Sequence, residues 1–222
     1  TWSLPSGTRS EALCKETLKL LKLSGCSKLT FAPETGSANV LKIIDKRANL
    51  SKMLIAMNNS AKEGIVTKAN IIFGFPGATW TDFFWDFIFL FKMAIAGVHD
   101  VTCFAFVPYP GSKIFNQLLK KKEIIRDDDY QMFLSYNVYN DISKMTSWCS
   151  SLRDWHIPLL TLSGMSFFYL IQFLVRPWRI LTSVWRILFG KPLTMFELAI
   201  ENMKNSFIKG NKLNIKSGQF EN

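Results

Sequence analysis

The first half of the chain alternates between segments with a helical period and short apolar runs. The apolar runs predict three strands, at residues 28–32, 65–75 and 99–107. The segments with the period of a helix lie at residues 11–25, 38–46, 52–64, 83–97 and 113–124. This alternation is typical of an α/β fold with a mostly parallel sheet and right-handed crossovers. We therefore expect three parallel strands with helices on one face, preceded by a linker at residues 1–10.

Polar residues directly before the helical segments predict where the helices begin. Ser10, Ser37 and Ser51 can each cap the first turn of the segment that follows. Thr79 and Asp82 have the spacing of a capping box, with Asp in the place of the usual Glu. The helix after this box is apolar on nearly every side, which predicts burial between two layers or contact with an apolar partner.

The pattern changes after residue 126. Residues 126–143 are polar and aromatic, and they predict a short helix and a loop. Residues 157–175 carry no charge, and at about 1.5 Å per residue such a helix would nearly cross a hydrocarbon core of about 30 Å. Polar and small residues interrupt this segment. Packing on the protein, lying on a membrane surface and spanning a membrane therefore all stay open as interpretations.

A stripe of large apolar residues follows directly. It comprises Trp178, Leu181, Trp185 and Leu188, while Arg179 and Arg186 lie off it, which is the pattern of a helix at a membrane surface. We expect that residues 157–190 do not span a bilayer, because lipid offers no partners to the polar side chains of this segment. We expect them instead to pack on the protein or to contact a membrane surface.

Charge and cysteine content bear on the partners and on the compartment. The net charge is +10, and much of the excess lies after residue 175. This excess suits an acidic partner such as nucleic acid or anionic lipid, or a solvated basic tail; nucleic acid is not the favoured partner. The four cysteines form no C-x-x-C motif, which favours reduced, buried cysteines in a cytoplasmic protein over a metal site assembled from all four. We expect a cytoplasmic protein with peripheral membrane contact through residues 157–190.

All three predicted strands end in loops that combine Pro, Gly and a hydroxyl residue. The loops read APETGS, FGFPGAT and FVPYPGS. Taken singly, each loop can simply turn a strand into a helix. Taken together, they predict one binding site, because ligands of parallel sheets bind at the carboxyl ends of the strands and open backbone lets a flat ligand lie close. Glu34, directly after the first predicted strand, can accept hydrogen bonds from both hydroxyls of a ribose, or it is a solvated loop acid.

Sequence motifs of several common enzyme classes are missing from these 222 residues. The sequence has no G-x-G-x-x-G, no Walker lysine motif and no H-E-x-x-H. His99 and His156 are isolated, and we interpret both as structural. No catalytic residue and no metal ligand is assigned.

As an ordered set, the strand ends resemble a known enzyme family. The segments LTFAPETGSANVLKIIDK, GIVTKANIIFGFPGATWTD and FAFVPYPGSKIF resemble successive strand ends in the second half of a radical S-adenosylmethionine barrel. The resemblance is to the group with an upstream cobalamin-binding domain, related to the anaerobic magnesium-protoporphyrin monomethyl ester cyclases. DDDYQMFLSYN and FFYLIQFLVRPWR are similar to the tail of that group. The resemblance covers residues 10–179.

This resemblance implies a fold and a set of binding residues. Residues 1–126 would be the second half of a partial TIM-like (β/α) barrel, and residues 127–222 a helical, aromatic and basic C-terminal extension. Glu34, with Thr35 and Ser37 nearby, would hold the ribose of S-adenosylmethionine. The adenine would lie against Ile72, Gly74 and Phe75, with Gly74 leaving out a side chain that would block the ring. The last strand would close the pocket with Phe106, Val107, Pro108 and Tyr109.

The resemblance also implies an activity. In the intact protein it would be the reductive cleavage of S-adenosylmethionine to a deoxyadenosyl radical, which methylates, cyclises or otherwise modifies a small-molecule or lipid-like substrate. The family's 4Fe-4S cluster, an electron donor protein and, in this group, cobalamin would take part. The cluster motif C-x-x-x-C-x-x-C and a cobalamin domain are missing from these residues. We therefore expect the C-terminal portion of a longer enzyme, inactive alone. The alternative is a membrane-surface binding or scaffold protein without catalytic activity.

Overall fold

The computed structural model describes residues 1–8, 13–122, 124, 145–190 and 192–205. The chain divides into two compact units, Thr1–Ile171 and Gln172–Asn222. The domain boundary expected at residues 126 and 127 falls outside the described residues, as do the short helix and loop expected at 126–143. The described residues from 145 to 171 belong to the first unit.

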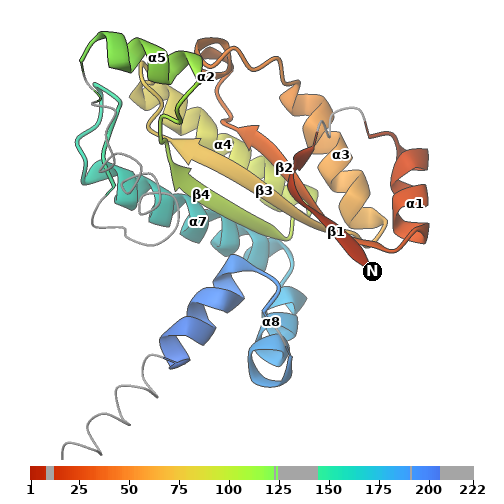
Figure 1. The fold of residues 1–222 in the computed structure, drawn as a ribbon. Helices are drawn as coiled ribbons and strands as arrows, with labels where there is room; N and C mark the ends of the chain where they lie inside the picture. Colours follow the sequence, from red (N-terminus) through yellow and green to blue (C-terminus); the bar gives the residue numbers. More distant parts are fainter. Residues whose placement is uncertain (9–12, 123, 125–144, 191, 206–222) are drawn as a thin grey trace, which may run out of the picture. The chain divides into compact units, whose positions relative to one another are not determined.

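The first unit is an α/β structure built on a four-stranded parallel sheet (Figure 1). The strands lie side by side in sequence order, as β1 (Trp2–Thr8), β2 (Cys26–Glu34), β3 (Val66–Phe73) and β4 (Asp100–Ala105). All neighbouring pairs are parallel, which confirms the predicted pairing of the three expected strands. The pairing of β3 with β4 runs without interruption from Lys68 opposite Asp100 to Phe73 opposite Ala105.

Strand β1 is a correction to the sequence prediction, which placed a linker there. Its segment WSLPSGT contains Pro, Ser and Gly, residues that favour turns. As an edge strand β1 pairs only with β2, and its register shifts twice. An edge position tolerates Pro5, because only one side of the strand has to supply ladder hydrogen bonds. Gly7 is required by close approach, since a Cβ there would overlap the Cβ of Ala32.

Helices cover one face of this sheet, with α3 and α4 behind the strands in Figure 1. The helices described in the first unit are α1 (Lys15–Leu23), α2 (Ala38–Ile43), α3 (Leu50–Lys62), α4 (Trp80–Ala96), α5 (Lys113–Lys120) and most of α7 (His156–Val175). The burial of β3 alternates along the strand, so that Ala69, Ile71 and Phe73 are buried while Asn70 and Ile72 on the opposite face are half-buried. The helix-covered face therefore holds the core, and the other face leads to the site described below.

Helix starts follow the predicted caps in part. Ser37 caps α2 by accepting from the backbone N–H groups of residues 39 and 40, and the Thr79–Asp82 capping box begins α4. The cap of α3 is Asn49 rather than Ser51. Helix α1 begins after Cys14, whose sulfur accepts from a backbone N–H, whereas Ser10 lies outside the described residues. Asn49 is as good a cap as Ser51 chemically, so residue type alone did not fix the start.

Helix α7 packs against β3, β4 and α4 in the first unit. The ring of Phe167 contacts that of Phe87 in α4, with centroids 5.6 Å apart. Gly164 lies so close to the sheet that a Cβ would come within 3.1–3.3 Å of Phe73 and Cys103. Within the described residues, α7 alone is long and apolar enough to cross a membrane by length and composition, and 33% of its most apolar window is buried. Its first part thus forms the protein contact that the sequence left open as one interpretation.

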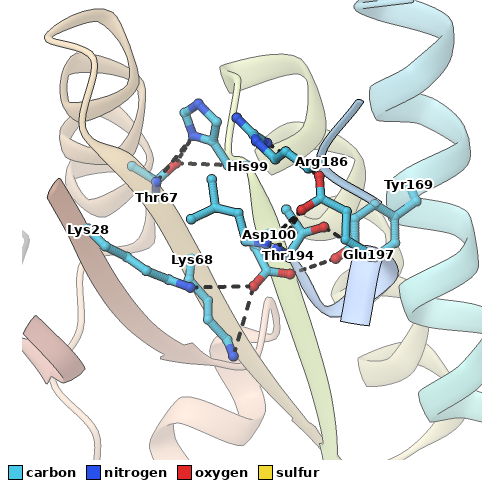
Figure 2. A network of polar contacts seen from close by, with 10 residues as sticks. Lys28, Thr67, Lys68, His99, Asp100, Tyr169, Arg186, Thr194 and Glu197 are labelled. Atoms are coloured by element: carbon cyan, nitrogen blue, oxygen red, sulfur yellow. Dashed lines mark hydrogen bonds and ion pairs between the residues drawn. The ribbon is translucent and has the colours of Figure 1, made fainter. Parts of the chain in front are cut away.

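A buried carboxylate joins the strands to α7 (Figure 2). Asp100, which opens β4, accepts a hydrogen bond of 2.6 Å from the hydroxyl of Tyr169 in α7. The ammonium groups of Lys28 and Lys68 lie 3.9 and 4.0 Å from its other oxygen. Burial lowers the pKa of Lys68, against the opposing effect of Asp100. His99 bonds Thr67 through its ring and its backbone, which agrees with a structural role.

Exchanging Gly164 for a large residue tests the packing of α7. Gly164→Leu should lower the free energy of unfolding by about 1–3 kcal/mol, because the added carbons have to displace Phe73 or Cys103. Ser166→Leu, at an exposed position of the same helix, should change it by less than about 0.5 kcal/mol. Urea unfolding followed by circular dichroism measures both values. Equal effects of the two variants would contradict the packing.

Candidate functional site

The carboxyl ends of β2, β3 and β4 border a cavity of about 660 Å³. Cavities of this size are typical of small-molecule sites. The lining is mainly apolar, with a few polar groups from the strand ends and from the segment after α2. The lining residues are Glu34, Ile43, Ile44, Asp45, Lys46, Asn70, Ile72, Phe75, Phe104, Ala105, Phe106, Val107, Tyr109, Ser112, Lys113 and Ile114.

Most of the residues selected from the sequence meet in this cavity. Six of the ten line it, namely Glu34, Ile72, Phe75, Phe106, Val107 and Tyr109. They come from all three strand ends that the sequence singled out. The rings of Phe75 and Phe106 contact each other, with centroids 4.8 Å apart, so two of these loops touch directly. The predicted convergence of the three loops is therefore present.

Thr35 and Ser37, which the resemblance implied beside the ribose, do not line this cavity. Both are buried, and their hydroxyls point to α4 rather than to the cavity. Thr35 donates to Asp86 at 2.5 Å, and Ser37 donates to Asp82 at 2.5 Å. Their role is to hold the loop after Glu34 against α4. A sequence cannot separate the two roles, because both use a hydroxyl next to the strand end.

Gly74 and Pro108 also lie outside the lining. Gly74 has a positive φ of 86°, and a Cβ built there would meet Ile157 Cδ1 at 2.6 Å. The missing side chain therefore makes room for Ile157 of α7, and the predicted contact of Gly74 with an adenine stays a prediction. Pro108 is buried between the lining residues Val107 and Tyr109.

Glu34 is held in an unusual backbone conformation at the rim of the cavity. Its φ is 66°, in the left-handed region, and the register of β2 against β3 shifts just before it. Lys46 donates to its carboxylate at 2.7 Å and to the carbonyl of Ala32 at 2.7 Å. The carboxylate keeps a second oxygen with no hydrogen bond from the described residues. Left-handed residues other than glycine cost about 1 kcal/mol or more, and such strain concentrates at functional sites.

Five polar lining residues were not selected from the sequence, namely Asp45, Lys46, Asn70, Ser112 and Lys113, and two of them make or lack notable hydrogen bonds. Lys46 lies 12 residues after Glu34, and no spacing rule connects a strand end to the far end of the next helix. Asn70 interrupts the apolar run of β3 two residues before Ile72, on the same face, which is a signal that sequence reasoning could have used. Among the described residues, Asn70 Oδ1 and the neighbouring Thr102 Oγ1 are buried and have no hydrogen-bond partner. Asn70, which lines the cavity, therefore has hydrogen-bonding capacity that the described residues leave unused.

Two acids of α4 fix the loop that carries Glu34. Asp86 accepts from the Thr35 hydroxyl and from the Gly36 N–H at 2.6 Å, while Asp82 accepts from Ser37, Asn39 and Thr79. Burial raises the pKa of Asp86 to about 7, although the hydrogen bonds from Thr35 and Gly36 act to lower it. At Asp82 burial also acts to raise the pKa, but four hydrogen bonds outweigh it and lower the pKa.

The described residues contain no group of three or more His, Cys, Asp or Glu side chains placed to hold a metal ion. The four cysteines are free, with Cys14 exposed and the other three buried.

Comparison with known proteins assigns no family: no protein-family model matches the sequence, and no curated protein matches it. The chemistry of the cavity therefore has to be inferred from its own residues.

The pKa of Asp86 predicts a pH dependence of stability. A carboxyl whose pKa rises from 3.8 in the unfolded chain to about 7 in the fold stabilises the fold fully below pH 3.8. This contribution is lost as the pH rises through about 7, because the unfolded state has by then released the proton that the fold retains. Asp86→Asn keeps an acceptor oxygen but cannot titrate, so it should flatten the decline in stability between pH 4 and 7. Urea unfolding at several pH values measures the decline, and an unchanged slope in the variant would contradict this account.

The conformation of Glu34 predicts that two substitutions at this position differ in stability. Glu34→Gly and Glu34→Ala both remove the carboxylate and its ion pair with Lys46. Glycine relieves the left-handed strain and alanine does not, so Glu34→Gly should be the more stable variant by about 1 kcal/mol. Urea unfolding compares the two directly. A more stable alanine variant would mean that the positive φ at this position carries no strain.

Proposed function

We propose that this chain is part of a radical S-adenosylmethionine enzyme and that the cavity receives the adenosyl end of S-adenosylmethionine. In this proposal the parallel sheet is the second half of a partial TIM-like (β/α) barrel. The observation that carries it is the meeting of Glu34 with the apolar ends of β3 and β4 in one cavity of about 660 Å³. Three loops far apart in the sequence contribute to it, in the order that the family resemblance implies.

The apolar part of the lining fits a flat base. Ile72, Phe75 and Val107 offer hydrocarbon and ring surface to the faces of an adenine, and burying such surface contributes about 25 cal/mol per Å². Asn70 offers the acceptor that a base with an amino group needs, because its Oδ1 has no partner among the described residues. An unpaired acceptor next to apolar lining residues is the combination expected of a site that binds a base with an amino group.

The polar rim fits a ribose. The carboxylate of Glu34 accepts from Lys46 with one oxygen and keeps acceptor capacity for the two hydroxyls of a sugar. A carboxylate is a charged acceptor, and charged acceptors form the stronger hydrogen bonds. Lys46 is thus a positioning residue, which sets the direction of the Glu34 carboxylate through its hydrogen bond.

The remaining chemistry would lie outside the described residues. S-adenosylmethionine bound beside a reduced 4Fe-4S cluster supplies radical chemistry for modifying a substrate. The proposal places the cluster ligands, the cobalamin domain if one is used, and the contact with an electron donor protein in other segments of the intact enzyme. What this chain would contribute is the binding and orientation of the adenosyl group. A small-molecule or lipid-like substrate is proposed from the resemblance alone.

Calorimetric titration of S-adenosylmethionine into the protein tests the proposed function. Glu34→Ala should weaken binding by roughly 1–3 kcal/mol through the loss of charged hydrogen bonds. Ile72→Trp should abolish binding by filling the cavity. Val66→Trp is the matched control, because it lies on the same face of β3 but outside the lining. Binding that survives both Glu34→Ala and Ile72→Trp unchanged would overturn the assignment.

A further inference from the structure

Strands β3 and β4 carry four polar residues in two neighbouring register pairs. Lys68 lies opposite Asp100, and Asn70 lies opposite Thr102. Because side chains alternate along a strand, all four lie on the face of the sheet opposite the core. We call these four residues the polar ladder. Buried parallel strands are usually apolar on both faces, so two adjacent polar pairs indicate a role beyond packing.

Two oxygen atoms of the polar ladder have no hydrogen-bond partner. Asn70 Oδ1 and Thr102 Oγ1 are buried, and no described residue pairs with either of them. Thr102 is only 5% exposed, so its hydroxyl is shielded from bulk solvent. A buried polar atom destabilises the fold unless another molecule pairs with it. Since Asn70 also lines the cavity, a bound molecule can approach the polar ladder from there.

The amine of Lys68 lies in surroundings that favour its uncharged form. Its side chain is 20% exposed, and its Nζ lies 4.0 Å from Asp100 Oδ2, a distance too long for a hydrogen bond. Lys28 Nζ lies 3.9 Å from the same oxygen, so two amines converge on one atom (Figure 2). Burial lowers the pKa of Lys68, Asp100 acts to raise it, and Lys28 acts to lower it. A desolvated lysine beside a second cation has the surroundings that activate lysine as a nucleophile.

A carboxylate that can transfer protons lies next to this amine. Asp100 is 1% exposed, and its Oδ1 accepts a hydrogen bond of 2.6 Å from the Tyr169 hydroxyl. This bond fixes the carboxylate so that Oδ2 is the oxygen near the amine of Lys68. A carboxylate held at this position can accept a proton from the nitrogen and pass it on.

We propose that Lys68 forms an imine with an aldehyde or ketone bound along the polar ladder. The uncharged amine attacks the carbonyl carbon, so that a C–N bond forms and the carbonyl electron pair moves onto oxygen. Thr102 donates a hydrogen bond to that oxygen, because its hydroxyl has no other partner among the described residues. Asp100 carries the two protons of the amine, one after the other, to the oxygen, which leaves as water. The step uses no oxidant or reductant, and it does not depend on the proposed radical function.

Reductive trapping with peptide mapping tests the proposal on the full chain. Acetaldehyde and sodium cyanoborohydride convert an imine into a stable N-ethyl lysine, which mass spectrometry locates after digestion. At neutral pH, Lys68 should be ethylated at least about tenfold faster than Lys92, an exposed lysine of α4, because a lowered pKa leaves more of the amine uncharged. Ethylation of Lys68 at the rate of Lys92 or below would overturn the proposal.

Variants of the neighbouring residues test the parts assigned to them. Thr102→Val keeps the shape of the side chain but loses the hydroxyl, so it should slow ethylation of Lys68 about tenfold and leave that of Lys92 unchanged. Lys28→Gln removes the second cation and should slow ethylation of Lys68 by about threefold or more. Lys52→Gln, at an exposed position of α3, is the matched control and should have no effect.

The stability of the variants separates chemistry from folding. Thr102→Val should not destabilise the protein, because it removes an unpaired buried hydroxyl, and urea unfolding measures this. Slower ethylation in a variant that is as stable as the wild type assigns the effect to the reaction. Rapid ethylation of Lys68 that Thr102→Val and Lys28→Gln both leave unchanged would mean an unassisted amine and would overturn the site.

Discussion

The position of the site depends on the hydrogen bonds between α4 and the loop after β2. Asp86 and Asp82 are one turn apart on α4, and together they accept hydrogen bonds from four residues of this loop, namely Thr35, Gly36, Ser37 and Asn39. Gly36 permits this approach, because a Cβ there would overlap the Trp85 carbonyl and Phe89. Glu34 is directly attached to this loop, so its carboxylate can face the cavity only while the loop stays on α4. An apolar helix therefore carries two buried acids for a positional reason.

The residues that line the cavity include strained backbone and an unpaired buried polar atom, both of which destabilise the fold. Glu34 and Asp45 are both lining residues with a positive φ, and Asn70 is a lining residue with an unpaired buried oxygen. An unpaired buried polar group costs about 1–3 kcal/mol, and strained backbone adds a similar amount. The helix-covered face of the sheet shows the opposite character, with Ala69, Ile71 and Phe73 fully buried. Such a division between a satisfied core and an unsatisfied cavity is expected of a binding site.

The sequence predicted those parts of the fold that depend on interactions between residues close together in the chain. The alternation of apolar runs and helical stripes was sufficient for β2, β3, β4 and their parallel pairing, and the capping box at Thr79 began α4 as expected. The prediction failed at β1, because its pairing with β2, and not its own sequence, makes this segment a strand. Thr35 faces α4 through a bond to Asp86, 51 residues away, and a contact of that range cannot be read from loop composition. Helix α8 (Trp178–Phe189) likewise buries Ser183 through a hydrogen bond to Glu197, which the sequence did not predict, although its apolar stripe was visible in the sequence.

A crystal structure of the intact protein with S-adenosylmethionine is the most direct test of the account. The account predicts the adenine between the ends of β3 and β4, against Ile72 and Val107, with the ribose hydroxyls hydrogen-bonded to Glu34. It also predicts that Thr35 stays on Asp86, because that bond holds the loop and not the ligand. A ligand bound away from this cavity, or a ribose held by Thr35 and Ser37 instead of Glu34, would contradict it.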